Sequence, residues 1–295
     1  MAVELLAPAK VNLALEVTGR RPDGYHDLVS VVQTIDLADR VLLDLAPSIE
    51  IEVTGEKTLG VPLEGPRNLA YRAAVALAAE AGDSDLGARI ELTKSVPAGV
   101  GLGGGSSDAA AVLRGLNRLW RLDLPAEALA RVAAGVGSDV PFFLAGGTAF
   151  VTGRGDHVEA LPDLGSASFT VFVSDIELED KTRRMYASLT PADFSDGRRA
   201  RVLAESLRRG LPLAEADLVN AFDRHIGEAA PPLGRAMATC REAGVAVFAC
   251  GSGPGFFTLD EVSGLLLREL EHEWGVTAVA CRALSRAESL ALREV

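Results

Sequence analysis

The sequence predicts an α+β fold in two domains, and three observations lead to that prediction. Residues 10–17 alternate as a strand does, and the β-rich runs that follow predict an antiparallel sheet. After residue 168 strands alternate with helical segments, which is typical of an α+β or α/β layer. The 295 residues, 48% of them hydrophobic, suffice for two cores. The stretch LPDLGSAS at 161–168 marks the expected boundary between the two domains, which are therefore 1–160 and 161–295.

The first strand, KVNLALEV, has two faces of different chemistry. One face is apolar throughout, whereas the other opens with Lys10 and Asn12, a cation followed by an amide. That second face is either solvated or the floor of a polar site. Pro8 is expected to limit the start of the strand. Three further strands are expected at 29–37, 41–45 and 49–53.

The segments after these strands each carry a turn or helix signal. The turn PDG precedes Tyr25 and His26, a pair that is either plain surface or part of a ligand site. A helix is expected from its N-cap Asn68 to Ala81, and another from Pro125 to about residue 135. In the second half, strands are expected at 169–175, 245–250 and 276–282, and helices from near Asp180 and at about 198–208, 215–228, 232–243 and 260–273.

A glycine-rich loop, PAGVGLGGGSSDAA (97–110), lies between a predicted strand and a helix expected to begin near Ser106, with Ser106 and Ser107 as candidate N-caps. The unpaired N–H groups and the dipole of a helix start favour an anion, and glycines let the loop close around a phosphate. A side chain at Gly103 or Gly104 is expected to occupy the phosphate space. Gly104→Val should therefore abolish phosphate binding and leave the fold intact, because the loop is predicted to lie outside both cores. The alternative is a flexible turn. The Walker A lysine and the acidic residue of dinucleotide-binding folds are both missing, so those two folds are disfavoured.

Two further stretches are open to two interpretations. Asp139, in GVGSDVPFF, is either a turn or N-cap aspartate, or a carboxylate at the base of a pocket, where it can act as a general base. The stretch CGSGPGFF (250–257) is either a turn between strands or a segment that closes over the ligand of the first loop.

Composition narrows the function classes. A net charge of −12 disfavours a duplex nucleic-acid partner, and no apolar run approaches the length that spans a membrane. The three cysteines and four histidines are not spaced along the sequence as metal ligands are, so the thiols are expected to be buried and reduced. The N-terminus shows no signal-peptide pattern, so the expected location is the cytoplasm. With only four lysines among 29 basic residues, each lysine is a candidate for a specific role.

Three segments resemble the motifs of the GHMP kinases, in order and over essentially the whole chain: PAKVNLAL (8–15), the loop 97–110 and GSG (251–253). The form GLGGGSSDAA, with RRPDGYHDL and GSDVPFF, is similar to the branch whose substrate is a cytidine diphosphate derivative of methylerythritol in the non-mevalonate route to isoprenoids. The resemblance implies an N-terminal domain with a left-handed βαβ unit, a ferredoxin-like C-terminal domain and an active site in the cleft between them.

The same resemblance implies roles for residues at the matching positions, with ATP and Mg²⁺ as cofactors. Lys10 and Asp139 are implied to be the catalytic pair, and Ser107 is a candidate Mg²⁺ ligand. On the substrate side the resemblance implies Asn12, Tyr25, His26, Thr182 and Tyr186. Those implied to bind ATP are Asn68, Leu69, Pro97, Ala98, Gly99, Val100, Gly101, Leu102, Gly103, Gly104, Gly105, Ser106 and Ser107.

The chain departs from the family pattern at two positions, and two other functions stay open. Pro254 stands where the third motif continues with a small residue, and Ala221, in LVNAFD, stands where an aspartate is common. One alternative is a diphosphomevalonate decarboxylase, which has the same fold. The other is a non-catalytic anion- or RNA-binding module, which the acidic charge balance disfavours.

Overall fold

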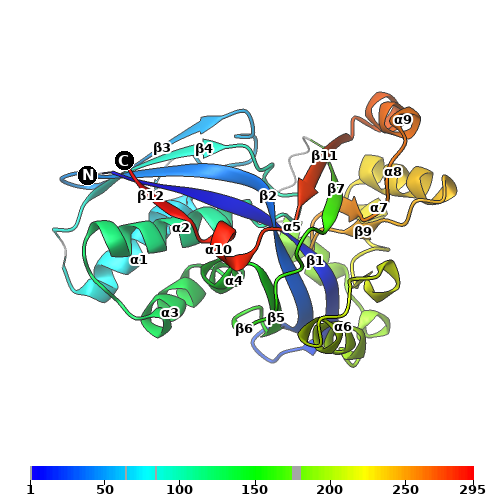
Figure 1. The fold of residues 1–295 in the computed structure, drawn as a ribbon, viewed down its shortest axis with the longest axis horizontal. Coiled ribbons are helices and arrows are strands. Elements are labelled where there is room, and N and C mark those ends of the chain that lie inside the picture. The colour runs from blue at the N-terminus through cyan, green and yellow to red at the C-terminus, as the bar shows by residue number, and fades with distance from the viewer. Residues whose placement is uncertain (1, 64, 84, 175–180) are drawn as a thin grey trace.

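The computed structural model describes residues 2–63, 65–83, 85–174 and 181–295 (Figure 1). Two sheets organise the molecule. The first has the order β12-β1-β2-β4-β3, with β5 paired to β2, β6 paired to β5 and β8 paired to β1, and the second has the order β11-β7-β10-β9. The mixed α and β architecture that the sequence predicts is confirmed.

The first sheet is built on two long antiparallel strands, β1 (Val3–Arg20) and β2 (His26–Leu45). The runs at 29–37 and 41–45, expected as separate strands, are both part of β2. The expectation for Pro8 was also wrong: this residue lies within β1, opposite Ala38, at a register shift that removes the need for its missing N–H. The other strands are β3 (Ile49–Gly55), β4 (Ala88–Lys94), β5 (Thr148–Gly153) and β6 (His157–Ala160).

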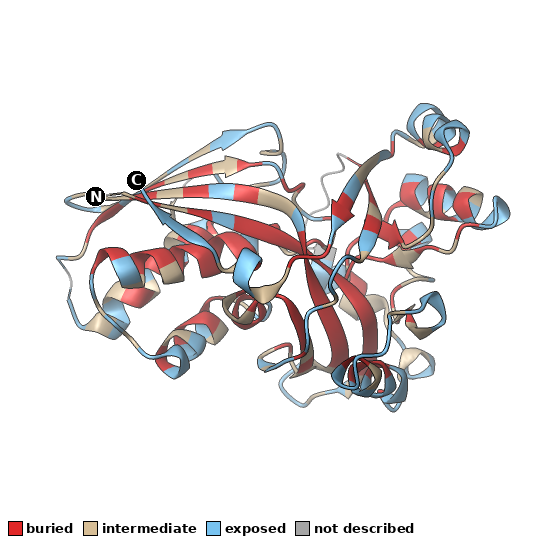
Figure 2. Ribbon diagram, viewed as in Figure 1, coloured by how far each residue is buried: buried red, intermediate tan, exposed pale blue. Residues whose placement is uncertain are grey.

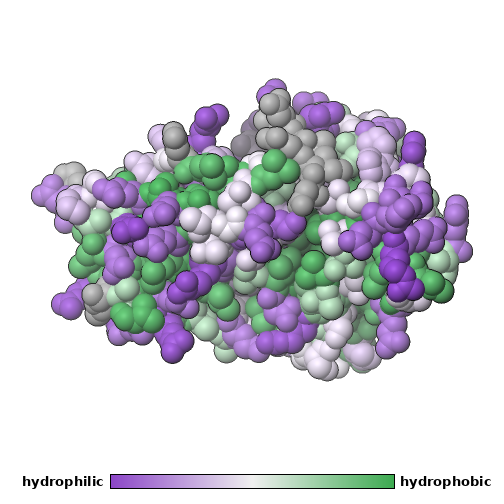
Figure 3. Space-filling view, turned by 90° about the horizontal axis from the view of Figure 1, so that it is seen from above, coloured by the Kyte–Doolittle hydropathy of each residue, from purple (hydrophilic) through white to green (hydrophobic). Residues whose placement is uncertain are grey.

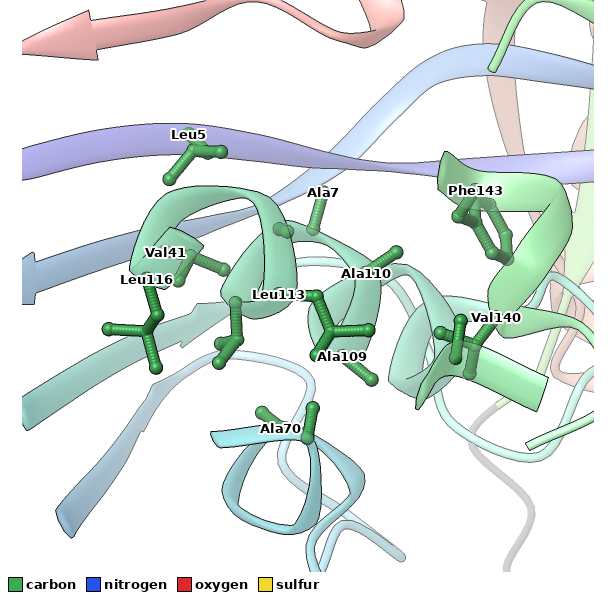
Figure 4. Close-up of a cluster of buried hydrophobic side chains, with 14 of the residues drawn as sticks. Leu5, Ala7, Val41, Ala70, Ala109, Ala110, Leu113, Leu116, Val140 and Phe143 are labelled. Atoms are coloured by element: carbon green, nitrogen blue, oxygen red, sulfur yellow. The ribbon is translucent and has the colours of Figure 1, made fainter. Parts of the chain in front are cut away.

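Helices cover one face of this sheet (Figure 1). As expected, Asn68 caps α1 (Leu69–Ala81), accepting a hydrogen bond from Ala70 N at 2.9 Å. The central helix α2 (Gly104–Leu119) packs Leu113 and its neighbours against Leu5 and Ala7 of β1 (Figure 4). Also on this side are α3 (Ala126–Val136) and α4 (Val140–Ala145).

The start of α2 differs from the expectation. The helix begins at Gly104, and its N-cap is Gly103 in the left-handed region (φ 75°), not Ser106 or Ser107. A side chain at Gly103 would lie 2.8 Å from the Phe143 ring and 3.2 Å from Lys10 Cγ. Packing therefore selects a glycine here, and it places both serines inside the first helical turns.

The second half supplies its own sheet and helices. Its strands β7 (Ser168–Val173), β9 (Phe248–Ala249), β10 (Phe256–Thr258) and β11 (Thr277–Arg282) pair antiparallel. The helix expected near Asp180, which lies outside the described residues, is described from Lys181 as α5 (Lys181–Ser188). The expected helix 215–228 is instead a 3₁₀ turn η3 (Glu215–Asp217), a strand β8 (Val219–Asn220) and a short helix α7 (Ile226–Ala229). The remaining elements are η1 (Gly65–Arg67), η2 (Pro191–Asp193), α6 (Arg198–Arg208), α8 (Pro231–Glu242), α9 (Gly264–Trp274), α10 (Arg286–Ser289) and β12 (Leu292–Glu294).

Segments of the second half also complete the first sheet. β8 pairs parallel with β1 at Leu15↔Asn220, and β12 pairs antiparallel with β1, so the two termini lie side by side (Figure 1). Glu16 of β1 accepts hydrogen bonds from Ser195 Oγ and Ala200 N, both at 2.8 Å, next to α6. The second face of β1 is therefore buried and not solvated (Figure 2).

The surface and the cysteines agree with the composition. Seen from above, hydrophilic side chains separate smaller hydrophobic areas (Figure 3). Among the described helices, none is both long and apolar enough to cross a bilayer. Among the described residues no disulfide joins Cys240, Cys250 and Cys281, and all three are buried, as expected.

Candidate active site

A cavity of about 1320 Å³ is lined by both halves of the chain. All the site residues expected from the sequence line it, except Val100 and Ser107. The side chain of Val100 is buried in the core, and Ser107 lies in the first turns of α2 with 2% of its surface exposed. The tertiary structure thus brings together residues that the sequence places up to 176 positions apart, from Lys10 to Tyr186.

The floor of the cavity is a polar network on β1. Lys10 Nζ donates to Asn12 Oδ1 at 2.6 Å, and Asn12 Nδ2 donates to Ser30 Oγ at 2.8 Å. Burial lowers the pKa of Lys10, whereas the charges of Asp139 and Cys250 oppose that shift. Of the two interpretations of this face, the polar site is therefore the one that the structure supports.

The glycine loop is fixed to the strands around it. Lys10 N donates to Leu102 O at 2.9 Å, and the side chains of Val100 and Leu102 are buried. The second glycine turn, 250–255, joins β9 to β10 and also packs on this loop, with Gly255 N donating to Val100 O at 3.1 Å. CGSGPGFF is therefore a turn between strands, and its residues Gly251 and Ser252 line the cavity, while its closure over a ligand stays a prediction.

The first turn of α2 faces the cavity. Gly105 is exposed there, and a Cβ at this position would touch only Leu69 Cδ1, at 3.7 Å. Behind it, Ser107 Oγ and Asp108 Oδ1 are buried and have no hydrogen-bond partner among the described residues. A 16-residue helix directs its N-terminal dipole at this point. The arrangement suits an anion held together with a cation.

A buried ionic cluster beneath the loop was not predicted from the sequence. Lys94 Nζ pairs with Asp39 and, at 2.7 Å, with Asp108, while Asp39 Oδ1 accepts from Ser95 N and Val96 N just before the loop. Burial raises the pKa of Asp108 to about 7, although Lys94 opposes the shift. The scarcity of lysine was the one signal that could have drawn attention to Lys94.

Asp139 occupies the N-cap position of α4 but makes no capping hydrogen bond with its side chain. Its carboxylate is exposed to the cavity instead. Burial, and then the charge of Asp139, raises the pKa of Tyr186. The carboxylate therefore acts electrostatically on both Lys10 and Tyr186, as a group in the cavity does and a simple capping aspartate does not.

Aromatic side chains form another wall of the cavity. The ring of Tyr25 is 52% exposed, and Arg154 Cζ lies 5.0 Å from its centroid. The His26 ring lies 5.2 Å from that of Tyr186, and burial, then Arg20, lowers the pKa of His26. Thr182 lines the same region from α5. Arg154, in the turn GRGD, is a residue of this wall that the sequence analysis missed.

The chain resembles known proteins in both sequence and structure. Residues 68–147 match the family described as GHMP kinases N terminal domain. A protein of Dehalococcoides mccartyi named 4-diphosphocytidyl-2-C-methyl-D-erythritol kinase is 39% identical over 257 residues, which are 86% of this chain and 88% of the relative. The chain belongs to the 4-diphosphocytidyl-2-C-methyl-D-erythritol kinase family.

Other relatives agree with this membership. The 4-diphosphocytidyl-2-C-methyl-D-erythritol kinase of Bacillus subtilis is 51% identical over 153 residues, 52% of each chain. A crystal structure of 4-(cytidine 5'-diphospho)-2C-methyl-D-erythritol kinase matches with a TM-score of 0.71 at 35% identity, covering 95% of this chain and 98% of that one. The homoserine kinase of Cytophaga hutchinsonii, 17% identical with a TM-score of 0.73 over 100% of this chain and 97% of its own, shares the fold.

The two departures from the GHMP kinase pattern are accommodated in this member of the kinase family. Around Pro254, which is buried, Cys250 N donates to Gly255 O at 2.7 Å, so the turn closes without an N–H at position 254. At the other departure, Ala221 N donates to Leu15 O at 2.9 Å and continues the pairing of β8 with β1.

Proposed function

We infer that this chain transfers the γ-phosphoryl group of ATP to the 2-hydroxyl of 4-diphosphocytidyl-2-C-methyl-D-erythritol. The observation that carries the inference is the cavity itself. It has a glycine loop and helix start suited to phosphates, Lys10 and Asp139 in the middle, and an aromatic wall suited to a nucleobase. Membership of the kinase family supports the same reaction.

Phosphoryl transfer requires the reacting groups in line and the phosphate charge neutralised. The loop N–H groups and the first turn of α2 would bind the β- and γ-phosphates. Asn68 and Leu69, at the start of α1, would border the adenine.

The residues near the loop also fit a magnesium ion. Mg²⁺ prefers oxygen ligands, and Ser107 Oγ and Asp108 Oδ1 are buried oxygens without a partner among the described residues. When bound, the ion would offset the negative charge of the phosphates. Asp108 lines the cavity and would hold the ion there, whereas Ser107, which does not line it, stays a predicted ligand.

Asp139 would accept the proton of the substrate hydroxyl, because it is an exposed carboxylate with no capping bond to release. Lys10, fixed by Asn12, would stabilise the charge of the transition state. The cytidine would bind near Tyr25 and His26, with Thr182 and Tyr186 on the same wall of the cavity.

A coupled assay of ADP release tests this function directly. The protein should release ADP with ATP, Mg²⁺ and the cytidylylated substrate. With diphosphomevalonate it should release neither ADP nor CO₂. Release of CO₂ from diphosphomevalonate would support the decarboxylase, and RNA binding without ADP release would support the binding module.

A further inference from the structure

The site leaves one sequence segment unexplained, LVNAFD (218–223), which lies behind the second glycine turn. Asn220 is buried, and its Nδ2 donates to Ala249 O at the end of β9 and to Gly251 O of the turn, both at 2.9 Å. Asp223 Oδ1 accepts from Ala249 N at 2.7 Å. The two side chains thus fix the last residue of β9 by two hydrogen bonds and the first part of the turn by a third, and neither lines the cavity.

The opposite side of the turn contacts the reacting groups. A Cβ at Gly251 would lie 2.5 Å from Lys10 Nζ and 3.1 Å from Asn12 Oδ1. A Cβ at Gly101 would collide with the carbonyl oxygen of Cys250, so the turn also presses on the phosphate loop. A shift of the turn away from β1 would therefore have two effects at once: it would free the ammonium group of Lys10, and it would loosen the phosphate loop.

Asn220 lies in the same sheet as the groups that it would position. Asn220 lies on β8, which pairs with β1 at Leu15, a few residues along the strand from Lys10 and Asn12. Phe222 N donates to Asn220 Oδ1 at 2.9 Å, which uses the acceptor of the amide and leaves both of its N–H groups for the turn.

We propose that Asn220 and Asp223 are positioning residues for phosphoryl transfer, which hold the turn 250–255 against Lys10 and the phosphate loop. The inference rests on the proposed kinase function. It goes beyond it by assigning a role to two residues that lie outside the cavity. Displacements of about 1 Å at a reacting group can cost about 10²-fold in rate, so the loss of this anchor should act mainly on kcat.

The test uses uncharged variants of similar size. Asn220→Leu and Asp223→Leu remove the hydrogen bonds, whereas Asp223→Asn keeps an oxygen that can accept from Ala249 N. We expect kcat to fall about 10²-fold in both leucine variants, with KM for the cytidylylated substrate unchanged. Asp223→Asn should recover most of that loss. Asn117→Leu is the matched control, because Asn117 likewise holds a loop, at Leu124, but lies at the far end of α2.

A titration of Lys10 gives a readout that needs no substrate. The chain has only four lysines, so their ¹³Cε signals can be resolved by NMR, and Lys10→Met assigns the signal of Lys10. Burial lowers the pKa of Lys10 in the wild type. If the turn moves away in Asn220→Leu, water reaches the ammonium group and this pKa should rise towards its ordinary value.

The outcomes separate the two proposals. A wild type that releases no ADP overturns the kinase function, while the Lys10 titration still tests the anchor. An active wild type with leucine variants of unchanged kcat and Lys10 pKa overturns the anchor alone. The anchor would also be overturned if Asn117→Leu lost as much kcat and thermal stability as Asn220→Leu, and the pKa of Lys10 did not change in Asn220→Leu. If Asn220→Leu does not fold, the Asp223 pair decides by the same measurements.

Discussion

At the residue scale, Asp139 is the proposed general base, because its carboxylate faces the cavity and caps nothing. Asp139→Asn keeps the shape and removes the basic oxygen. We expect kcat to fall by about 10²–10⁴-fold with little change in the substrate KM. Steady-state kinetics of ADP release measure both constants. A variant that keeps more than about half of the wild-type activity would contradict this role.

Tyr25 presents an exposed ring in the cavity, with Arg154 5.0 Å from its centroid. Stacking of a base on an aromatic side chain is worth about 1–3 kcal/mol, or about 5- to 150-fold in affinity. Tyr25→Ala should therefore raise the KM for the cytidylylated substrate by about that factor, and leave the KM for ATP unchanged. Tyr25→Phe is the control and should be nearly silent. If Tyr25→Phe raised this KM as much as Tyr25→Ala, the hydroxyl and not the ring would be the recognising group.

At the element scale, the start of α2 is the proposed phosphate site, and the structure changes the choice of variant. Gly104→Val does not test it, because a Cβ at Gly104 would lie 3.0 Å from Val96 Cγ1, in the core and not in the phosphate space. Gly105 is open to the cavity and is the better position.

Gly105→Asp should weaken ATP binding by about 10- to 100-fold, because two like charges about 4 Å apart repel by several kcal/mol at a protein surface. The fold should survive, since an acidic residue in the first turn of a helix is favourable. Gly105→Asn, of equal size and uncharged, is the control, and titration calorimetry with ATP measures both. Unchanged affinity in Gly105→Asp would mean that the phosphates bind elsewhere.

The segment from α5 to η2 forms the wall that carries Thr182 and Tyr186, and Asp193 fastens it. Asp193 accepts from Thr190 N and Oγ1 at 2.7 and 2.8 Å, and it meets His225 Nε2 at 2.9 Å. Burial by itself raises the pKa of Asp193, but hydrogen bonds from Thr190 and His225 hold it well below its usual range.

We expect Asp193→Asn to lower the free energy of unfolding by about 1–2 kcal/mol near pH 7. A lowered native pKa stabilises the fold above the unfolded pKa of about 4, and that stabilisation is lost as the pH falls below it. The difference between wild type and variant should therefore shrink below about pH 4. Urea unfolding at several pH values measures this. A difference that stays constant down to pH 3 would contradict the assignment.

At the scale of the whole molecule, the two halves share a core. One buried cluster contains Val11 and Leu13 of β1 together with Leu203 of α6 and Val171 of β7. The strands β8 and β12 from the second half pair with β1. The division into domains 1–160 and 161–295 stays a prediction about the organisation of the chain. The shared core indicates that the two parts unfold together.

The two tryptophans report on the two halves separately. Trp120 ends α2, and Trp274 ends α9. In the single-tryptophan variants Trp274→Phe and Trp120→Phe, the fluorescence of the remaining tryptophan follows unfolding in urea. The urea midpoints of the two variants should differ by no more than the two substitutions themselves account for. Coincident transitions from different probes indicate one cooperative unit. A clearly separate second transition, seen by circular dichroism in either variant, would show that the halves unfold independently.

The sequence by itself determined the features whose cause lies in neighbouring residues. The alternation of 10–17 specifies a strand, Asn68 specifies the start of α1, and the glycines of 97–105 specify a loop, which lines the cavity. Matching motifs extended this to the family and the expected site residues, most of which line one cavity. Their roles stay predictions.

Only the tertiary structure decided what depends on residues distant in the chain. Pro8 fits inside β1 because β2 shifts register beside it, and α2 starts at Gly104 because the ring of Phe143 excludes a side chain at Gly103. The pair of Lys94 with Asp39, 55 residues away, has no local pattern. Such contacts arise from the packing of whole elements, and neither propensity nor periodicity along the chain encodes which of them meet.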